Sequence, residues 1–276
     1  MRWPDSRIPA VGLAAILVAF ASLAAGCRTT PDPAPRDPEV RLSPTPVEGE
    51  LIARRQFEVW LKPAPEAAET KVGLMFETEY RTKDGLLVHV TEAKTILGRG
   101  TSVLTNWNKT TFVEDAAGRP VRFAVVTINN PGRQVRSYEG RIEGARMRLI
   151  SGAGGDTRTR EIDVPAGTTT LPAMRRALVA RGLTVGLTVE GLAFPIPEEP
   201  EKPHPAVMKV TGRETAAFAG KPVELFAVLT GRQLFSDARG EPVWNGETVY
   251  MDARGETHRI EGNQSGGGKI VIRRVK

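Results

Sequence analysis

The chain has 276 residues, of which 40% are hydrophobic and 25% charged, and 38 Lys and Arg against 32 Asp and Glu give a formal net charge of +6. This composition excludes a disordered chain and a protein with many membrane spans, and the single Cys excludes an internal disulfide and a zinc site built mainly on thiolates. The basic residues are dispersed and no recognition motif accompanies them, so we expect no nucleic-acid partner.

The first segment of the chain has the layout of a secretory signal peptide. Arg2 and Arg7 precede a mostly apolar run over 11–25, and small residues follow. The run is shorter than the roughly 20 residues that a membrane span needs. The pattern therefore predicts a signal peptide over 1–26.

The end of this signal carries the only cysteine. Ala24-Ala25-Gly26-Cys27 resembles the lipobox of bacterial lipoproteins, although the family favours Leu where this chain has Ala24. The resemblance implies signal cleavage after Gly26 and a membrane anchor through acylated Cys27. Arg28, rather than Asp, follows the cysteine, which in this family favours the outer membrane, facing the periplasm, over the inner membrane. The alternative is a plain secretory signal with an incidental thiol.

The next segment, 27–50, is polar and contains six prolines, so we expect an extended tether. From Leu51 to the end at 276, apolar residues recur with a period of two, which is typical of strands with one face on a core. The pattern Asp-Ala-x-Gly occurs at 115–118, 237–240 and 252–255 and predicts hairpin turns. About ten antiparallel strands in one large sheet are expected.

One segment interrupts the strands with a helical pattern over 171–181. It follows Thr170, has Pro172 in its first turn and is stopped by Gly182. We expect a single short helix that plugs one end or face of the sheet. A second proline cluster, 195–205, predicts a long exposed loop, which serves either as a connector or as a lid over a ligand.

Motifs for catalysis and metal binding are weak in this sequence. His89, His204 and His258 lack the spacing of metal ligands, and no nucleophile-elbow motif is present. We therefore expect no catalytic residue, no metal and no cofactor. The acidic pairs Glu77/Glu79 and Glu161/Asp163 leave a carboxylate-dependent hydrolase open as one alternative.

Three short stretches suggest a family. Leu171-Pro172 with the following helix and Gly182, residues 211–215 with the next strand, and residues 249–259 resemble a module of poorly characterised bacterial envelope proteins. In that family a β-rich domain stands alone or precedes a transglutaminase-like domain. The resemblance implies a mainly β fold, in which a large antiparallel sheet curls into an open half-barrel with one short helix, as in the lipoprotein carriers LolA and LolB.

Three hypotheses for function follow. The first is a non-enzymatic, membrane-anchored envelope lipoprotein that binds an apolar ligand or an envelope protein partner. The second is a structural or assembly factor with no ligand cavity, and the third is the carboxylate-dependent hydrolase. For the first, the candidate lining residues of an apolar cavity are Trp60, Trp107, Phe123 and Phe226. The 171–181 helix and the 195–205 loop are its expected gates.

Overall fold

The computed structural model describes residues 49–99, 102–130, 134–153, 156–194, 202–236, 242–263 and 268–275. This part of the chain contains fifteen strands and one helix, and that helix is too short to cross a membrane. The elements are β1 (Gly49–Lys62), β2 (Thr70–Thr82), β3 (Leu87–Arg99), β4 (Ser102–Glu114), β5 (Pro120–Asn130), β6 (Gln134–Glu143), β7 (Arg146–Ala153), β8 (Asp156–Asp163), β9 (Thr168–Thr169), α2 (Leu171–Ala180), β10 (Thr188–Ala193), β11 (His204–Phe218), β12 (Lys221–Ser236), β13 (Pro242–Met251), β14 (Thr257–Asn263) and β15 (Lys269–Arg274).

All of these strands belong to one sheet, in the order β8-β7-β6-β5-β4-β3-β2-β1-β15-β14-β13-β12-β11-β10-β9. Neighbouring strands are antiparallel except β9 and β10, which are parallel. Because β8 and β9 lie at opposite ends of the order and do not pair, no strand ladder closes the described sheet into a barrel. The mainly β, curled and open architecture is confirmed, but the prediction of about ten strands was too low. Charged strands such as β8 have no apolar period by which they could be recognised.

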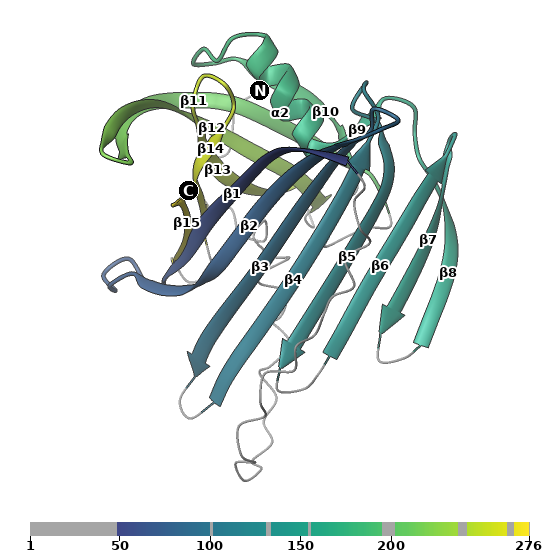
Figure 1. Ribbon diagram of the computed structural model, residues 1–276, viewed down its shortest axis with the longest axis horizontal. Coiled ribbons are helices and arrows are strands. Elements are labelled where there is room, and N and C mark those ends of the chain that lie inside the picture. Colours follow the sequence, from purple (N-terminus) through teal and green to yellow (C-terminus); the bar gives the residue numbers. More distant parts are fainter. Residues whose placement is uncertain are drawn as a thin grey trace.

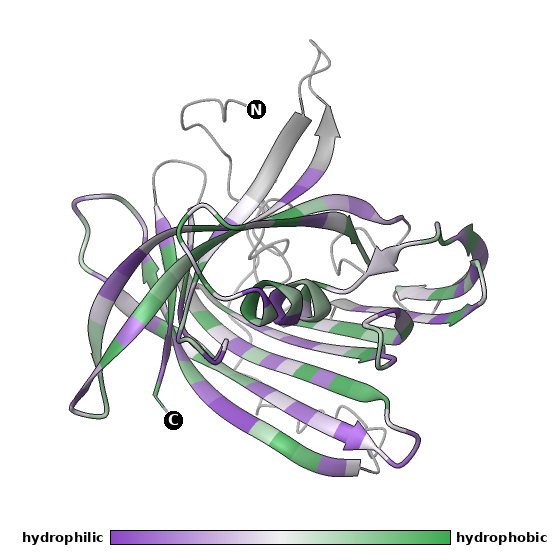
Figure 2. Ribbon diagram, turned by 90° about the horizontal axis from the view of Figure 1, so that it is seen from above, coloured by the Kyte–Doolittle hydropathy of each residue, from purple (hydrophilic) through white to green (hydrophobic). Residues whose placement is uncertain are grey.

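The sheet curls so that its β9 end lies near the β4–β5 turn (Figure 1). The backbone N–H of Thr170, next to β9, donates to the carbonyl oxygen of Gly118 in the β4–β5 turn, at 3.2 Å. The Thr169 hydroxyl donates to the same oxygen, at 3.2 Å. Seen from above, α2 lies in the middle of the curl with strands around it (Figure 2).

Two of the three Asp-Ala-x-Gly motifs form the same hairpin turn. In each, the Asp carboxylate accepts two backbone N–H groups, at 2.9 and 3.0 Å for Asp115 and at 3.0 Å twice for Asp252. Gly118 and Gly255 take φ of 79° and 81°, a left-handed conformation that favours glycine. The third motif, at 237–240, lies outside the described residues.

The helix prediction is confirmed and the loop prediction needs one correction. Thr170 caps α2 by accepting the N–H of Ala173 at 3.1 Å, and Gly182 follows the helix with φ of 77°. The proline-rich loop was expected to extend to 205, but β11 already begins at His204, so Pro205 is a strand residue. A proline is tolerated near the first position of a strand, where it removes few ladder bonds.

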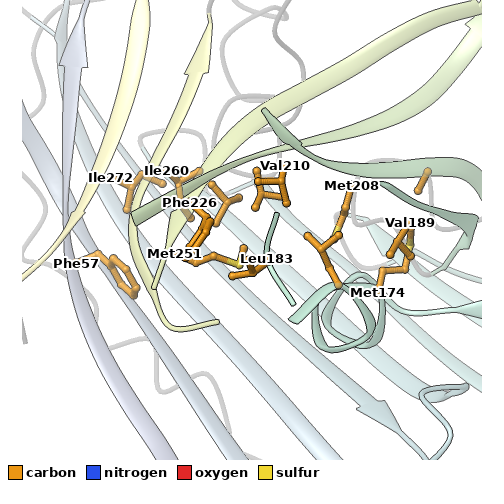
Figure 3. Packing of buried hydrophobic residues seen from close by; sticks show 14 of the residues in the cluster. Phe57, Met174, Leu183, Val189, Met208, Val210, Phe226, Met251, Ile260 and Ile272 are labelled. Atoms are coloured by element: carbon orange, nitrogen blue, oxygen red, sulfur yellow. The ribbon is translucent and has the colours of Figure 1, made fainter. Parts of the chain in front are cut away.

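Two apolar clusters lie inside the curl. The larger one gathers side chains of β1–β3 and β10–β15 around α2, with Phe57, Leu178, Val210 and Val228 fully buried (Figure 3). The smaller one joins β5 and β7 to Phe194, whose ring meets Phe123 edge-on with centroids 5.9 Å apart. The interior of the molecule around α2 is therefore packed with apolar side chains.

Candidate functional site

The face of the sheet that meets α2 can be followed from strand to strand. On β1, Phe57 and Val59 belong to the cluster around the helix, and the register places them opposite Met75 and Gly73 of β2. The same register continues through Ala93 and Thr95 of β3 to β4 and β5. We call this the inner face.

On β3, β4 and β5 the inner face changes from apolar to polar. The register aligns Thr95 of β3 with Asn106 of β4, and Asn106 with Asn129 of β5. Two residues further along β4, Asn108 is aligned with Thr127 of β5. We call these residues, with Thr110, the inner polar row. Four of its members are almost fully buried, with exposed fractions of 2% for Thr95 and Asn106, 6% for Asn108 and 5% for Thr110. None of the six carries a charge.

The hydrogen bonds of the inner polar row are incomplete. The Asn108 amide donates to the Thr127 hydroxyl at 3.0 Å, and the Thr110 hydroxyl donates to the Asn108 carbonyl oxygen at 3.1 Å. Within the described part of the chain, Thr95 Oγ1 and Asn129 Oδ1 are buried and have no hydrogen-bond partner. Because an unmade hydrogen bond at a buried polar atom costs about 1–3 kcal/mol, such atoms are rare in folded proteins and each one calls for an explanation.

Apolar side chains border the row on two sides. Met75 and Ala93, in the larger cluster, lie beside it on β2 and β3. Phe112 and Tyr138 flank it on β4 and β6, where they are partly buried against the smaller cluster. The inner face therefore offers neutral polar groups next to aromatic and aliphatic surface, an arrangement that suits an amphipathic ligand.

The four expected cavity residues are not brought together. Phe226 is buried in the larger cluster and Phe123 in the smaller one. Trp60 alternates with Val59 and so lies on the opposite face, where the Arg273 guanidinium lies over its ring, 5.6 Å from the ring centroid. Trp107 lies between Asn106 and Asn108 on β4 and therefore also faces away from the inner side.

The N-terminal end of α2 is bound to the sheet by a fully buried carboxylate, Glu114. Its Oε1 lies 2.9 Å from His89 Nε2 and 2.5 Å from the Arg176 guanidinium, while Oε2 accepts the Thr170 hydroxyl. Burial raises the pKa of Glu114, but the hydrogen bonds from His89 and Thr170 and the charge of Arg176 outweigh it, so the net pKa lies below the ordinary value. Glu114 is thus an ionised anchor and a poor general acid.

Further along α2, the helix meets a second charged group, at the β13–β14 turn. Arg175 donates to the Thr257 hydroxyl at 3.0 Å. Nearby, Asp252, Glu256 and His258 bring one ligand atom each within 4.8 Å of the others. His258 is 9% exposed and neither of its ring nitrogens makes a hydrogen bond in the described residues; burial and the charge of Arg274 lower its pKa.

This second group is already neutralised by arginine. Arg254 lies 3.3 Å from Asp252 Oδ2 and 3.5 Å from Glu256 Oε2, and Arg274 lies 2.7 Å from Glu256. The pKa of Glu256 is lowered mainly by its hydrogen bond from Arg274. The guanidinium groups supply the positive charge that a metal ion would bring, so we assign this group a role in holding the turn.

The other residues that the sequence singled out for catalysis or metal binding make structural contacts or lie exposed. His204 Nδ1 lies 2.9 Å from the carbonyl oxygen of Gln233. Glu79 is paired with Arg55 at 2.8 Å, and Glu161 is an exposed residue of the edge strand β8. Among the described residues, the carboxyl groups with a displaced pKa all have it lowered, so none of them is the raised-pKa acid that glycoside hydrolysis needs.

The inner polar row was missed by sequence reasoning. Its signal is Thr105-Asn-Trp-Asn-Lys-Thr110, in which the polar residues at 106, 108 and 110 share a face. Such a strand is normally assigned a solvent-facing polar side, and only the register with β3 and β5 reveals a buried band. The lipidation and cleavage residues Ala24, Ala25, Gly26 and Cys27 lie outside the described residues.

Comparison with known proteins supports the architecture. The chain matches no protein-family model and no curated protein. Among solved structures it is similar to a beta-barrel-like protein of the domain of unknown function DUF1849 from Brucella abortus, with a TM-score of 0.59 and 16% sequence identity over 83% of this chain and 98% of that one. At this identity the likeness shows the fold alone: an unclosed, curled, barrel-like sheet.

Proposed function

We propose that the chain is a non-enzymatic lipoprotein of the bacterial cell envelope that binds a ligand with an apolar part on the inner face of its curled sheet. The observation that carries the binding proposal is the inner polar row, which is buried next to apolar surface and has two unpartnered oxygens among the described residues. A protein that merely fills its interior has no need of such atoms, because isosteric apolar residues would stabilise it more.

The envelope location rests on the sequence. The signal pattern, the lipobox-like residues before Cys27 and the proline-rich tether together describe a domain held at a membrane surface, and Arg28 favours the outer membrane, facing the periplasm. The charge-paired carboxylates support a role without catalysis.

One observation favours a second candidate, a structural or assembly factor without a ligand. The interior around α2 is packed, with Leu178 and Phe57 fully buried, and no gate is needed for a filled core. This candidate accounts for the α2 end of the molecule and leaves the inner polar row unexplained.

A matched pair of tyrosines tests the binding proposal. Tyr138 lies on the inner face of β6 and Tyr80 on the opposite face of β2, and both are partly buried. The full chain carrying Cys27→Ser, which has no acyl chain of its own, is titrated with the uncharged apolar dye Nile red. We expect saturable binding that Tyr138→Ser weakens about fivefold, the equivalent of about 1 kcal/mol of lost apolar contact, and that Tyr80→Ser leaves within about twofold. Absence of saturable binding, or equal weakening by both variants, would favour the structural candidate.

A further inference from the structure

Strand β8 forms one edge of the described sheet. It is the last strand of the order and pairs with β7 alone among the described strands, and Figure 1 shows it as the outermost strand on the right. Its residues pair with Arg146–Ala153 without a bulge, and all of them are exposed except Ile162, which is partly buried. The free side of such a strand directs backbone N–H and C=O groups to solvent, where a further extended segment can add a ladder.

Arginines give the inner face of this edge a positive charge. Arg160 lies opposite Leu149 of the smaller apolar cluster, so Arg160 and Arg158 are on the inner face, and both are exposed. Ile162 follows them on the same face and packs against that cluster. Asp156, at the start of the strand, is the one acidic residue of β8 on this face. A segment that pairs with β8 therefore meets two positive charges and one apolar side chain along its length.

The acidic residues on the other face of β8 are already balanced within the sheet. The Arg146 guanidinium lies 3.4 Å from Glu161 and 4.0 Å from Asp163. Arg148 of β7 is directly opposite Glu161. Because the outer face has as many arginines as acids here, the charge preference of the edge comes from the inner face, which favours a strand with acidic side chains on that side.

A second copy of this chain does not fit the edge. Two copies related by a two-fold axis would form an antiparallel ladder in which residues of the same face lie opposite each other. Pairings of five or more β8 residues centred on residue 158, 159 or 160 set arginine opposite arginine, and one centred on 161 sets Glu161 opposite itself. Like charges directly opposite each other destabilise a ladder, so the partner is a different chain.

We propose that β8 is an interaction edge that pairs with an extended acidic segment of another protein. Along one face of that segment, two acidic side chains lie opposite Arg158 and Arg160, and an apolar side chain lies opposite Ile162. Backbone hydrogen bonds supply the attachment, and the arginines select the acidic partner. This inference goes beyond the proposed function and does not depend on a ligand of the inner face.

The probe is a synthetic seven-residue peptide with blocked termini and an uncharged fluorescent dye, designed to pair antiparallel with residues 157–163. It has valine at its second position, glutamate at its fourth and sixth, and threonine elsewhere, which sets valine opposite Ile162 and the glutamates opposite Arg160 and Arg158. Fluorescence anisotropy measures its binding to the full chain carrying Cys27→Ser. We expect a dissociation constant of about 100 µM, and at least about tenfold weaker binding when lysine replaces both glutamates. No binding of the glutamate peptide, or equal binding of the lysine peptide, would overturn the inference.

Two N-methylated versions of the peptide separate strand pairing from charge attraction alone. Successive residues of a strand direct their N–H groups to opposite sides, so methylation of either the even or the odd positions keeps the charges and blocks one side only. We expect one version to bind within about twofold of the parent peptide and the other at least about tenfold more weakly. Equal binding of the two versions would indicate a simple ionic attraction and overturn the pairing.

Matched arginine variants locate the site on the chain. Arg158→Gln removes a charge from the inner face of β8, whereas Arg148→Gln removes one from the outer face of β7, where it is also exposed. We expect Arg158→Gln to weaken the glutamate peptide about threefold, as for one exposed cross-strand ion pair, and Arg148→Gln to leave its binding unchanged. Equal losses would overturn the assignment to β8. A dimer of the chain in sedimentation that the peptide dissociates would also overturn it, because a second copy would then occupy the edge.

Discussion

At the scale of single residues, Glu114 shows what a charge needs in order to be buried. It is fully inaccessible to solvent, yet it has three partners from three places in the fold: His89 of β3, Thr170 before α2 and Arg176 on α2. A buried carboxylate without such partners would cost several kcal/mol. The residue therefore joins the end of β4 to the start of the helix.

Glu114→Gln keeps the volume of this side chain and removes its charge. Because hydrogen bonds to a charged group contribute about 1.5–3 kcal/mol, we expect the free energy of unfolding to fall by about 2 kcal/mol. Urea denaturation measures the change. The control is Glu143→Gln, which alters an exposed pair with Arg141 and is expected to shift stability by no more than about 0.5 kcal/mol. Equal effects of the two substitutions would contradict the anchoring role.

The same variant has a pH signature. The pKa of Glu114 in the folded protein lies below its ordinary value of 4.5, so the ionised form stabilises the fold above that pH. The contribution is lost as the pH falls through the lowered folded-state pKa. The stability difference between wild type and Glu114→Gln should therefore be full at neutral pH and shrink below pH 4.5. A difference that stays constant or grows on acidification would show that Glu114 is not held as an ion.

At the scale of elements, α2 is held between two copies of one turn. A Cβ on Gly118 would overlap the Ala173 Cβ, and one on Gly255 would lie 2.7 Å from a Val179 methyl. The helix thus packs directly on both glycines, and two of its arginines, at 175 and 176, bind the strands beyond them. These contacts are those of a fixed plug, so the structure gives no support to a gating movement of the helix.

Three glycines in equivalent turn positions test this packing. Gly85, Gly118 and Gly255 have φ of 80°, 79° and 81°, but among these three only Gly85 has empty space where a Cβ would lie. Gly85→Ala should cost about 1–2 kcal/mol for the left-handed backbone alone. Gly118→Ala and Gly255→Ala should cost clearly more, because the helix must also shift. Urea unfolding of the three variants gives the comparison, and three equal losses would argue against close packing of α2.

The elements also show what the sequence can and cannot specify. Thr170 and Gly182 encode the helix boundaries locally, and Asp115 encodes its turn, so these features were predictable. Pairings between distant segments, such as β1 with β15, depend on the whole chain and leave no local mark. The four candidate cavity residues lie apart for the same reason: alternation predicts that Phe123 and Trp107 each point to one side of a strand, but only the register between strands decides which side meets the core.

At the scale of the whole molecule, the lipoprotein proposal makes Cys27 the point of attachment to the membrane. Replacing Cys27 with Ser should abolish incorporation of a labelled fatty acid and release the protein from the membrane fraction, because no other cysteine is present. The control is Ser43→Ala, an equally small change in the expected tether that leaves Cys27 intact and should alter neither readout. Labelling that survives Cys27→Ser would contradict the anchor.

The central claim is that the curled sheet holds a ligand on its inner face, and native mass spectrometry addresses it most directly. The full chain carrying Cys27→Ser is produced in a Gram-negative bacterium, purified without added amphiphile and measured under gentle ionisation, before and after solvent extraction. The account predicts an extra mass from one bound organic molecule, which extraction releases and which Tyr138→Ser largely removes while Tyr80→Ser retains it. A spectrum that contains only the bare chain before extraction, with or without the tyrosine substitutions, would contradict the claim.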